Sequence, residues 1–219
     1  MKKTFQILIC FLLISSLFGC QQQDKDNIRF KKEYESYNEQ KLDGKTLSAI
    51  SIDENNTIKY VDYQHLIDGL ENGSHVVYMG YPTCPWCRRA IPVLIDTVNQ
   101  YAGVSIYYCD MKKARDDYEN HLSTEDSQAY QKVLDVIACS EYDFGEIFDY
   151  FDDGSIKIGA STVFFVKEGE IVGATKRTVE SHIDPYEELT QLQTNQLSDI
   201  YKTYLDIVVK KVPVGCYGC

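Results

Sequence analysis

The sequence has little positive charge. Of its 219 residues, 33 are acidic and only 22 are lysine or arginine, which gives a formal net charge of −11 at pH 7. A surface of this sign repels polyphosphate backbones, and the chain has no basic cluster of the kind that binds nucleic acid. We therefore exclude nucleic acid as a partner.

The sequence also has few prolines, five in all, and it shows no internal repeat and no low-complexity segment after residue 40. Hydrophobic residues make up 44% of the chain and aromatic residues 12%, which is enough to build a packed core and excludes global disorder. A chain of this length is typical of one domain with small additions.

The apolar run at the start of the chain, residues 4–18, is too short for a membrane-spanning helix, which needs about 20 residues. It follows Lys2 and Lys3, an order typical of a secretory signal peptide, which we assign to residues 1–19. The run ends in "LFGC", which resembles the lipobox of bacterial lipoproteins. This resemblance implies a lipid on Cys20 and an anchor at the extracytoplasmic face of the bacterial cell membrane. The alternative is an uncleaved signal anchor with a chance cysteine.

Residues 20–45 are polar and charged, so we expect a lipidated N-terminus and a tether there, in which a helix can form from Ile28 onward. Beyond them, residues 46–212 alternate between strand and helix patterns in the manner of an α/β domain. These patterns fall at residues 57–60, 62–70, 76–79, 85–101 and 104–110. Strand, helix and strand in this order form a right-handed parallel unit. The run "STVFFVKEGEIVGATKR", residues 161–177, predicts a hairpin that turns at Glu168 and Gly169.

Two further segments have helical patterns. Residues 111–153 are charged and mostly helical, which predicts an insertion or cap. Cys139 on the apolar face of this insertion and Cys109 on the preceding strand are both expected to be small core residues. A long helix is predicted from Asp184 to about Lys210. Its inward face is predicted to contain Leu189, Leu192, Leu197, Ile200, Tyr204, Leu205 and Val208.

Two cysteines stand at the start of the helix predicted over residues 85–101, in the stretch "YPTCPWCRRAIP". The helix dipole and the free N–H groups at this point stabilise the Cys84 thiolate and lower the pKa of the thiol. Cys87 lies one turn further on, close enough to attack a mixed disulfide at Cys84 and resolve it. Arg88 and Arg89 add positive charge if their side chains turn toward the sulfurs. The pattern predicts a redox-active pair, with a structural disulfide or chance spacing as the alternative.

The stretch "VVYMGYPTCPWCRRAIPVL", residues 76–94, resembles the active-site strand, C-x-x-C motif and kinked helix of the thioredoxin-like superfamily, with Pro92 as the kinking proline. The resemblance implies an α/β fold with a central mixed sheet flanked by helices, and it makes Cys84 and Cys87 the catalytic pair. It also implies a substrate groove lined by Pro85, Trp86, Ser161 and Thr162. With its lipobox and acidic helical insertion, the chain looks most like lipoproteins grouped with bacteriocin transport accessory proteins.

The sequence departs from the family at two positions. Thioredoxins have a cis-proline before the first hairpin strand, and Ser161 stands in that place here. A cis bond before a residue other than proline costs about 2.5 to 4 kcal/mol, so we expect Ser161 to be trans and the groove wall to be altered. Tyr78 replaces the buried aspartate of the active-site strand, and a neutral phenol is a poor base near pH 7.

A second cysteine pair, Cys216 and Cys219, stands in the C-terminal stretch "GCYGC". The pair is open to three roles: a disulfide of its own, a relay of electrons to Cys84, or a zinc site shared with Cys84 and Cys87. The separate disulfide is favoured, because exported thiols tend to oxidise and zinc ribbons bring their two pairs from closer in sequence.

We expect no metal and no cofactor, because the four histidines have no metal-ligand spacing and suit solvated or capping positions. They are His65, His75, His121 and His182. The acidic run at Asp116, Asp117 and Glu119 is interpreted as a solvated helix face.

Together these features predict a membrane-anchored, extracytoplasmic thiol–disulfide oxidoreductase that acts on protein thiols or disulfides outside the membrane. The direction of electron flow stays open. The alternative is a non-enzymatic accessory lipoprotein that uses the same fold to hold an exported peptide or a membrane partner. The intact "CPWC" favours the enzyme, and the missing proline at position 161 favours the alternative.

Overall fold

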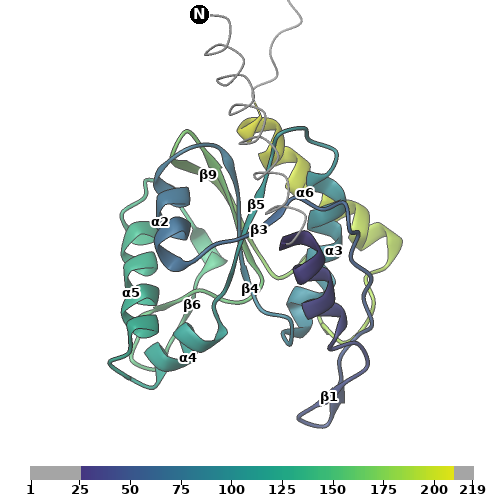
Figure 1. Ribbon diagram of the computed structural model, residues 1–219, viewed down its shortest axis with the longest axis horizontal. Coiled ribbons are helices and arrows are strands. Elements are labelled where there is room, and N and C mark those ends of the chain that lie inside the picture. Colours follow the sequence, from purple (N-terminus) through teal and green to yellow (C-terminus); the bar gives the residue numbers. More distant parts are fainter. Residues whose placement is uncertain (1–25, 210–219) are drawn as a thin grey trace, which may run out of the picture.

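The computed structural model describes residues 26–209, which surround a five-stranded mixed sheet (Figure 1). The strands lie in the order β3-β5-β4-β8-β9. Strands β3, β5 and β4 are parallel, whereas β8 runs antiparallel to β4 and β9 runs antiparallel to β8. The bounds are β3 Ile58–Tyr60, β4 His75–Gly80, β5 Ile106–Asp110, β8 Thr162–Lys167 and β9 Glu170–Lys176. All five strands were predicted from the sequence, as was the turn between β8 and β9.

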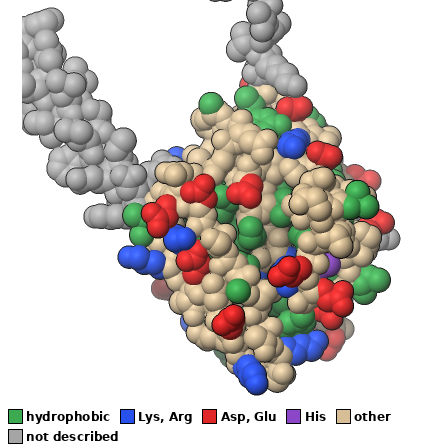
Figure 2. All heavy atoms as spheres, turned by 90° about the vertical axis from the view of Figure 1, so that its right-hand side faces the viewer, with side chains coloured by type: hydrophobic (Ala, Val, Ile, Leu, Met, Phe, Trp, Pro, Cys, Tyr) green, Lys and Arg blue, Asp and Glu red, His purple; other side chains and the backbone are tan. Residues whose placement is uncertain are grey.

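Helices cover both faces of the sheet, as Figure 1 shows. One face carries α2 (Tyr63–Glu71), α4 (Lys112–Glu119) and α5 (Glu125–Ala138). The other carries an N-terminal helix over residues 26–35, α3 (Pro85–Val98) and α6 (Gln191–Val208). On the outer side of this second layer, acidic and basic side chains are interspersed (Figure 2).

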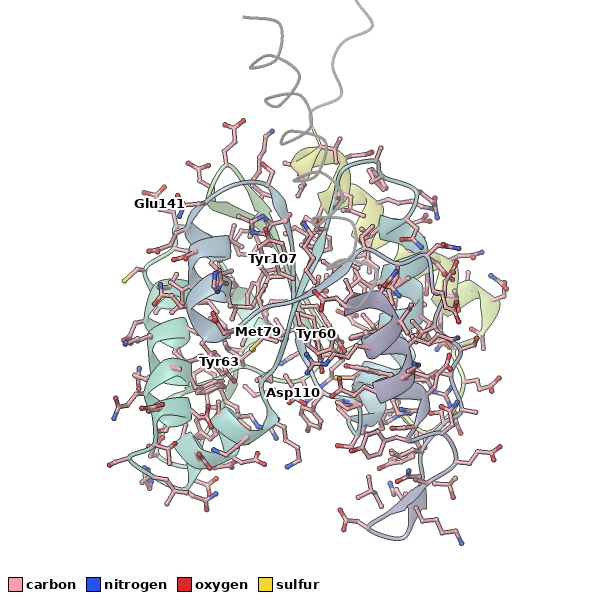
Figure 3. The ribbon with its side chains drawn as sticks, viewed as in Figure 1. Tyr60, Tyr63, Met79, Tyr107, Asp110 and Glu141 are labelled. Carbon is pink, nitrogen blue, oxygen red and sulfur yellow. The ribbon has the colours of Figure 1, made fainter. Side chains whose placement is uncertain are left out.

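Alternating side chains of the central strand supply both cores, because successive residues of a strand point to opposite faces. Tyr78 packs in the cluster formed with α3 and α6, and Met79 packs in the cluster formed with α2 and α5. Figure 3 shows Met79 and Tyr63 on the α2 and α5 side of the sheet, and Tyr60 toward the N-terminal helix.

The N-terminal helix corrects the prediction of a tether at residues 20–45. Phe30 and Tyr34 lie four residues apart on one helical face, and both side chains are fully buried, with their rings stacked at 4.3 Å between centroids. Residues 26–35 therefore belong to the folded domain. They are followed by a short hairpin of β1 (Lys41–Leu42) and β2 (Lys45–Thr46).

The insertion is helical only as far as Ala138. It continues through a 3-10 turn at Gly145–Ile147 into β6 (Asp149–Tyr150), which pairs with β7 (Ile156–Lys157). Helix α5 contributes to the core through the buried side chains of Tyr130, Val133, Leu134 and Ile137.

The last helix begins at Gln191 instead of Asp184, because Thr190 and Gln193 form a reciprocal capping box at its start. Its buried stripe contains Leu197, Tyr201, Leu205 and Val208. The prediction that Leu192 and Ile200 face inward was wrong, since they are 68% and 38% exposed. Within residues 26–209 no helix combines the length and the apolar character needed to cross a membrane.

Candidate active site

The predicted cysteine pair lies where β4 meets α3. Cys84 is the N-cap of α3, and Pro85 occupies the first helical position, where its missing N–H costs no hydrogen bond. The backbone N–H of Cys87 donates to Cys84 Sγ over 3.4 Å. Both are free thiols, with Cys84 4% exposed and Cys87 fully buried. The structure therefore brings the two sulfurs together within one helical turn.

The two thiols differ in acidity. A hydrogen bond from the Cys87 thiol is the largest influence that lowers the pKa of Cys84, and the backbone N–H groups of Cys87 and Trp86 act in the same direction. Burial raises the pKa of Cys87 well above the ordinary thiol value, and its hydrogen bond to Cys84 raises it further. Cys84 is thus the more acidic of the two sulfurs and ionises first.

The cation that favours the Cys84 thiolate comes from the insertion. Arg115 on α4 lowers the pKa of Cys84 through its charge. Its guanidinium lies 5.2 Å from the ring centre of Tyr81, and its Nη2 lies 3.4 Å from the Tyr81 hydroxyl. Tyr81 follows β4 directly, three residues before Cys84. Arg115 could not be predicted as part of the site, because a run of charged residues does not indicate which side chain will contact a loop that is distant in the sequence.

Arg88 and Arg89 turn away from the sulfurs. Arg89 donates to the carbonyl oxygens of Pro185 and Tyr186 over 3.2 and 2.9 Å. Arg88 is fully buried, and its donors reach only backbone carbonyls and one amide oxygen, those of Tyr34, Ser48, Pro82 and Asn38. Arg88 therefore fastens the N-terminal segment to the loop that leads into Cys84.

The peptide bond between Ala160 and Ser161 is cis, so the prediction of a trans bond was wrong. That prediction weighed only the intrinsic preference of the peptide bond, whereas the segment is fixed by its surroundings. The Ser161 carbonyl accepts from the Arg177 N–H over 2.8 Å, and the Thr162 hydroxyl donates to the Gly159 carbonyl over 2.5 Å. Ser161 is 1% exposed, and Thr162, the first residue of β8, is fully buried and pairs with Met79 of β4.

Trp86 and Pro85 remain partly exposed beside Cys84. The indole of Trp86 meets the ring of His182 edge-on at 5.5 Å, and the guanidinium of Arg177 lies over the indole at 5.5 Å. His182 is buried, with its ring nitrogens 2.9 Å from the Thr178 hydroxyl and 3.1 Å from the Glu187 carbonyl. His182 therefore packs against Trp86, and the prediction of a solvated or capping position was wrong for this histidine.

His75 is buried as well, since it stacks on Tyr107 at 4.3 Å, whereas His65 lies exposed beside the N-cap Asp62 as predicted. In the acidic run, Asp116 and Asp117 pair with Lys112 and Lys113 at 2.5 and 2.9 Å. No group of three or more His, Cys, Asp or Glu within residues 26–209 is arranged to hold a metal ion.

The other cysteines lie apart from this pair. Cys109 is buried as predicted, and burial raises its pKa to about 12. Cys139 is exposed, contrary to prediction, because α5 ends at Ala138 and Cys139 caps it. Cys20, Cys216 and Cys219 lie outside the described residues.

The strand order and the placement of the dithiol define the class of protein. A mixed sheet with helices on both faces, and two cysteines at the start of the helix that follows the central strand, form an α/β thioredoxin-like fold. This confirms the predicted fold class. The assignment of the fold rests on the strand order and on the position of the two cysteines, and it does not depend on sequence identity to any known protein.

No family model matches the chain, and no curated protein matches it either. Among solved structures, the chain is similar to thioredoxin O2 from Arabidopsis thaliana in its oxidised state (15% identity, TM-score 0.38, covering 68% of this chain and 94% of that one). It is also similar to thioredoxin O1 from the same plant (16%, 0.36, 67% and 99%) and to thioredoxin from Aeropyrum pernix (17%, 0.33, 65% and 86%).

Proposed function

We propose that the protein is a thiol–disulfide oxidoreductase that uses Cys84 and Cys87 on protein thiols or disulfides. The observation that carries this proposal is the asymmetry of the pair: the more acidic sulfur caps a helix and keeps a small exposed fraction, and the less acidic one is fully buried one turn behind it. A purely structural pair has no need of this difference in acidity. We also propose that Pro85, Trp86, Ser161 and Thr162 line the groove for the partner's backbone; Pro85 and Trp86 are partly exposed next to Cys84 in the chain.

In the reducing direction, the Cys84 thiolate attacks one sulfur of a partner disulfide. A new bond forms between Cys84 and that sulfur, and the partner's second sulfur leaves as a thiolate. Cys87 then loses its proton and attacks Cys84 Sγ, which releases the partner's first sulfur. Two electrons pass from the dithiol to the partner, and the Cys87 proton goes to the departing sulfur. In the oxidising direction the same steps run in reverse.

Equilibration of the full chain in glutathione redox buffers tests this function. We expect Cys84 and Cys87 to convert together between dithiol and disulfide as a two-electron couple, for which about 30 mV corresponds to a tenfold change in equilibrium constant. Peptide mass spectrometry after acid quenching and alkylation measures the fractions. Cys109 serves as the control, because its burial and raised pKa keep it out of exchange. Failure to recover a Cys84–Cys87 disulfide at any potential would contradict the proposal.

We further propose that the protein acts outside the cytoplasmic membrane, anchored by a lipid on Cys20. The support is the order of basic residues, apolar run and "LFGC" at the N-terminus, together with the resemblance to lipoproteins grouped with bacteriocin transport accessory proteins. Expression in a bacterium should place the full chain in the membrane fraction and the Cys20→Ser variant outside it. Equal partition of both chains would refute the lipid anchor and leave the redox chemistry unaffected.

A further inference from the structure

Two tyrosine hydroxyls lie in contact behind the dithiol. Tyr78 on β4 and Tyr34 on the N-terminal helix are both fully buried, and their hydroxyl oxygens are 3.2 Å apart. Only one of the two can be the donor in that hydrogen bond. If Tyr34 donates to Tyr78, the Tyr78 hydrogen is free to point elsewhere.

The Tyr78 hydroxyl lies beside Cys87. Gly80 shows this, because a β-carbon built on Gly80 would stand 2.5 Å from the Tyr78 hydroxyl oxygen and 2.9 Å from Cys87 Sγ. Both atoms therefore border the same carbon-sized space. Because Gly80 has no side chain, nothing from this residue separates the Tyr78 hydroxyl from the Cys87 sulfur.

We propose that Tyr78 is a catalytic residue that donates a hydrogen bond to the Cys87 thiolate, and that Tyr34 is a positioning residue that orients the Tyr78 hydroxyl by donating to its oxygen. This inference rests on the proposed oxidoreductase function. It assigns a chemical role to the N-terminal helix, which carries Tyr34 to the buried side of the pair.

The hydrogen bond acts in both directions of exchange. When Cys87 resolves a mixed disulfide, its proton goes to the departing partner sulfur, and Tyr78 stabilises the thiolate that attacks Cys84. When a partner thiolate attacks Cys84 of the disulfide, the bond to Cys87 breaks, and Tyr78 stabilises Cys87 as the leaving thiolate. Tyr78 keeps its own proton throughout, since burial raises the pKa of Tyr78 well above that of an ordinary phenol.

Other titratable groups also lie near Cys87. They come from the dithiol helix, the loop before it, the N-terminal helix and α6, and they are Cys84, Arg88, Tyr81, Tyr34 and Tyr201. Two hydrogen bonds besides the one with Cys84 bear on the pKa of Cys87, one from the Tyr78 side chain and one from the Tyr81 backbone, and both lower it. Of the two donors, Tyr78 acts through its side chain, so a substitution can remove its hydrogen bond. Buried donors of this kind favour a thiolate at a site from which water is excluded.

The lifetime of the mixed disulfide at Cys84 tests the proposal. The reduced full chain is mixed with excess oxidised glutathione, quenched with acid at successive times, and analysed by peptide mass spectrometry across a range of pH. A hydrogen bond to a charged group is worth enough that Tyr78→Phe should slow resolution at pH 7 by about tenfold and shift the pH profile upward by about one unit. Tyr34→Phe should shift the profile in the same direction by a smaller amount.

Tyr201→Phe is the matched control, because it removes an equally buried hydroxyl from the same core and should leave the profile unchanged. Unaltered resolution in Tyr78→Phe overturns the proposal, and so does a slower rate without a shift in the pH profile, which is the mark of a structural defect. If Tyr78→Phe does not fold, Tyr34→Phe decides by the same criterion. Failure of the unmodified protein to form a Cys84–Cys87 disulfide refutes the proposed function instead.

Discussion

Replacing Cys84 with serine should abolish thiol–disulfide exchange, and replacing Cys87 with serine should trap the partner. Without Cys84 the chain has lost the nucleophile of the first step, and we expect exchange to fall by roughly a thousandfold or more. Without Cys87 the first attack still occurs, because Cys84 keeps the backbone N–H groups and the nearby Arg115 that favour its thiolate. The mixed disulfide then has no neighbouring sulfur to resolve it, so it should accumulate.

The trapped species can be isolated from detergent lysates of cells that express the Cys87→Ser chain, separated without reductant and released with dithiothreitol. The double variant Cys84→Ser/Cys87→Ser is the matched control, since it retains the exposed Cys139, which should capture nothing specific. Capture that persists in the double variant would assign the reactivity to another thiol. A Cys84→Ala/Cys87→Ala chain that keeps its partner and its biological effect would favour the accessory role over the enzyme.

The parts of the site that could be predicted from the sequence are those coded locally. Cys84, Pro85 and Cys87 stand at a strand-to-helix junction, and the apolar run before them and the helical spacing after them are both short-range patterns. The hairpin turn is equally local, since Gly169 has a φ of +85° and glycine is the residue that adopts it freely. These features depend on neighbours a few residues away.

The parts that could not be predicted depend on contacts between distant segments. Tyr34 reaches Tyr78 from a segment that looked like a tether, because its few apolar residues gave no signal of which partner they would meet. Arg115 lies in a helix whose charges all suit a solvated face, and only the packing of that helix brings one of them to Tyr81. The cis bond before Ser161 is likewise fixed by surroundings that no local preference describes.

Arg88 is the residue whose loss should most destabilise the fold. Its side chain is fully buried, and it donates to the carbonyls of Tyr34, Ser48 and Pro82 over 2.8, 2.8 and 3.0 Å. Arg88→Met keeps the length of the side chain and removes every donor, so each of these carbonyls loses a charged hydrogen bond. Because each charged hydrogen bond contributes about 1.5 to 3 kcal/mol, we expect the free energy of unfolding to fall by about 3 to 5 kcal/mol.

Urea denaturation of the reduced full chain measures this loss in the free energy of unfolding, and two further variants serve as comparisons. Arg88→Lys keeps the charge but not the planar fork that serves several acceptors at once, so it should recover only part of the stability. Arg89→Met is the neighbouring control, since Arg89 is less buried and bonds two carbonyls, those of Pro185 and Tyr186, and its loss should cost about 1 to 2 kcal/mol. If Arg88→Met cost no more than Arg89→Met, the N-terminal segment would not depend on Arg88 for its attachment. A large loss would instead show that the segment carrying Tyr34 and the loop carrying Cys84 are held together by one side chain.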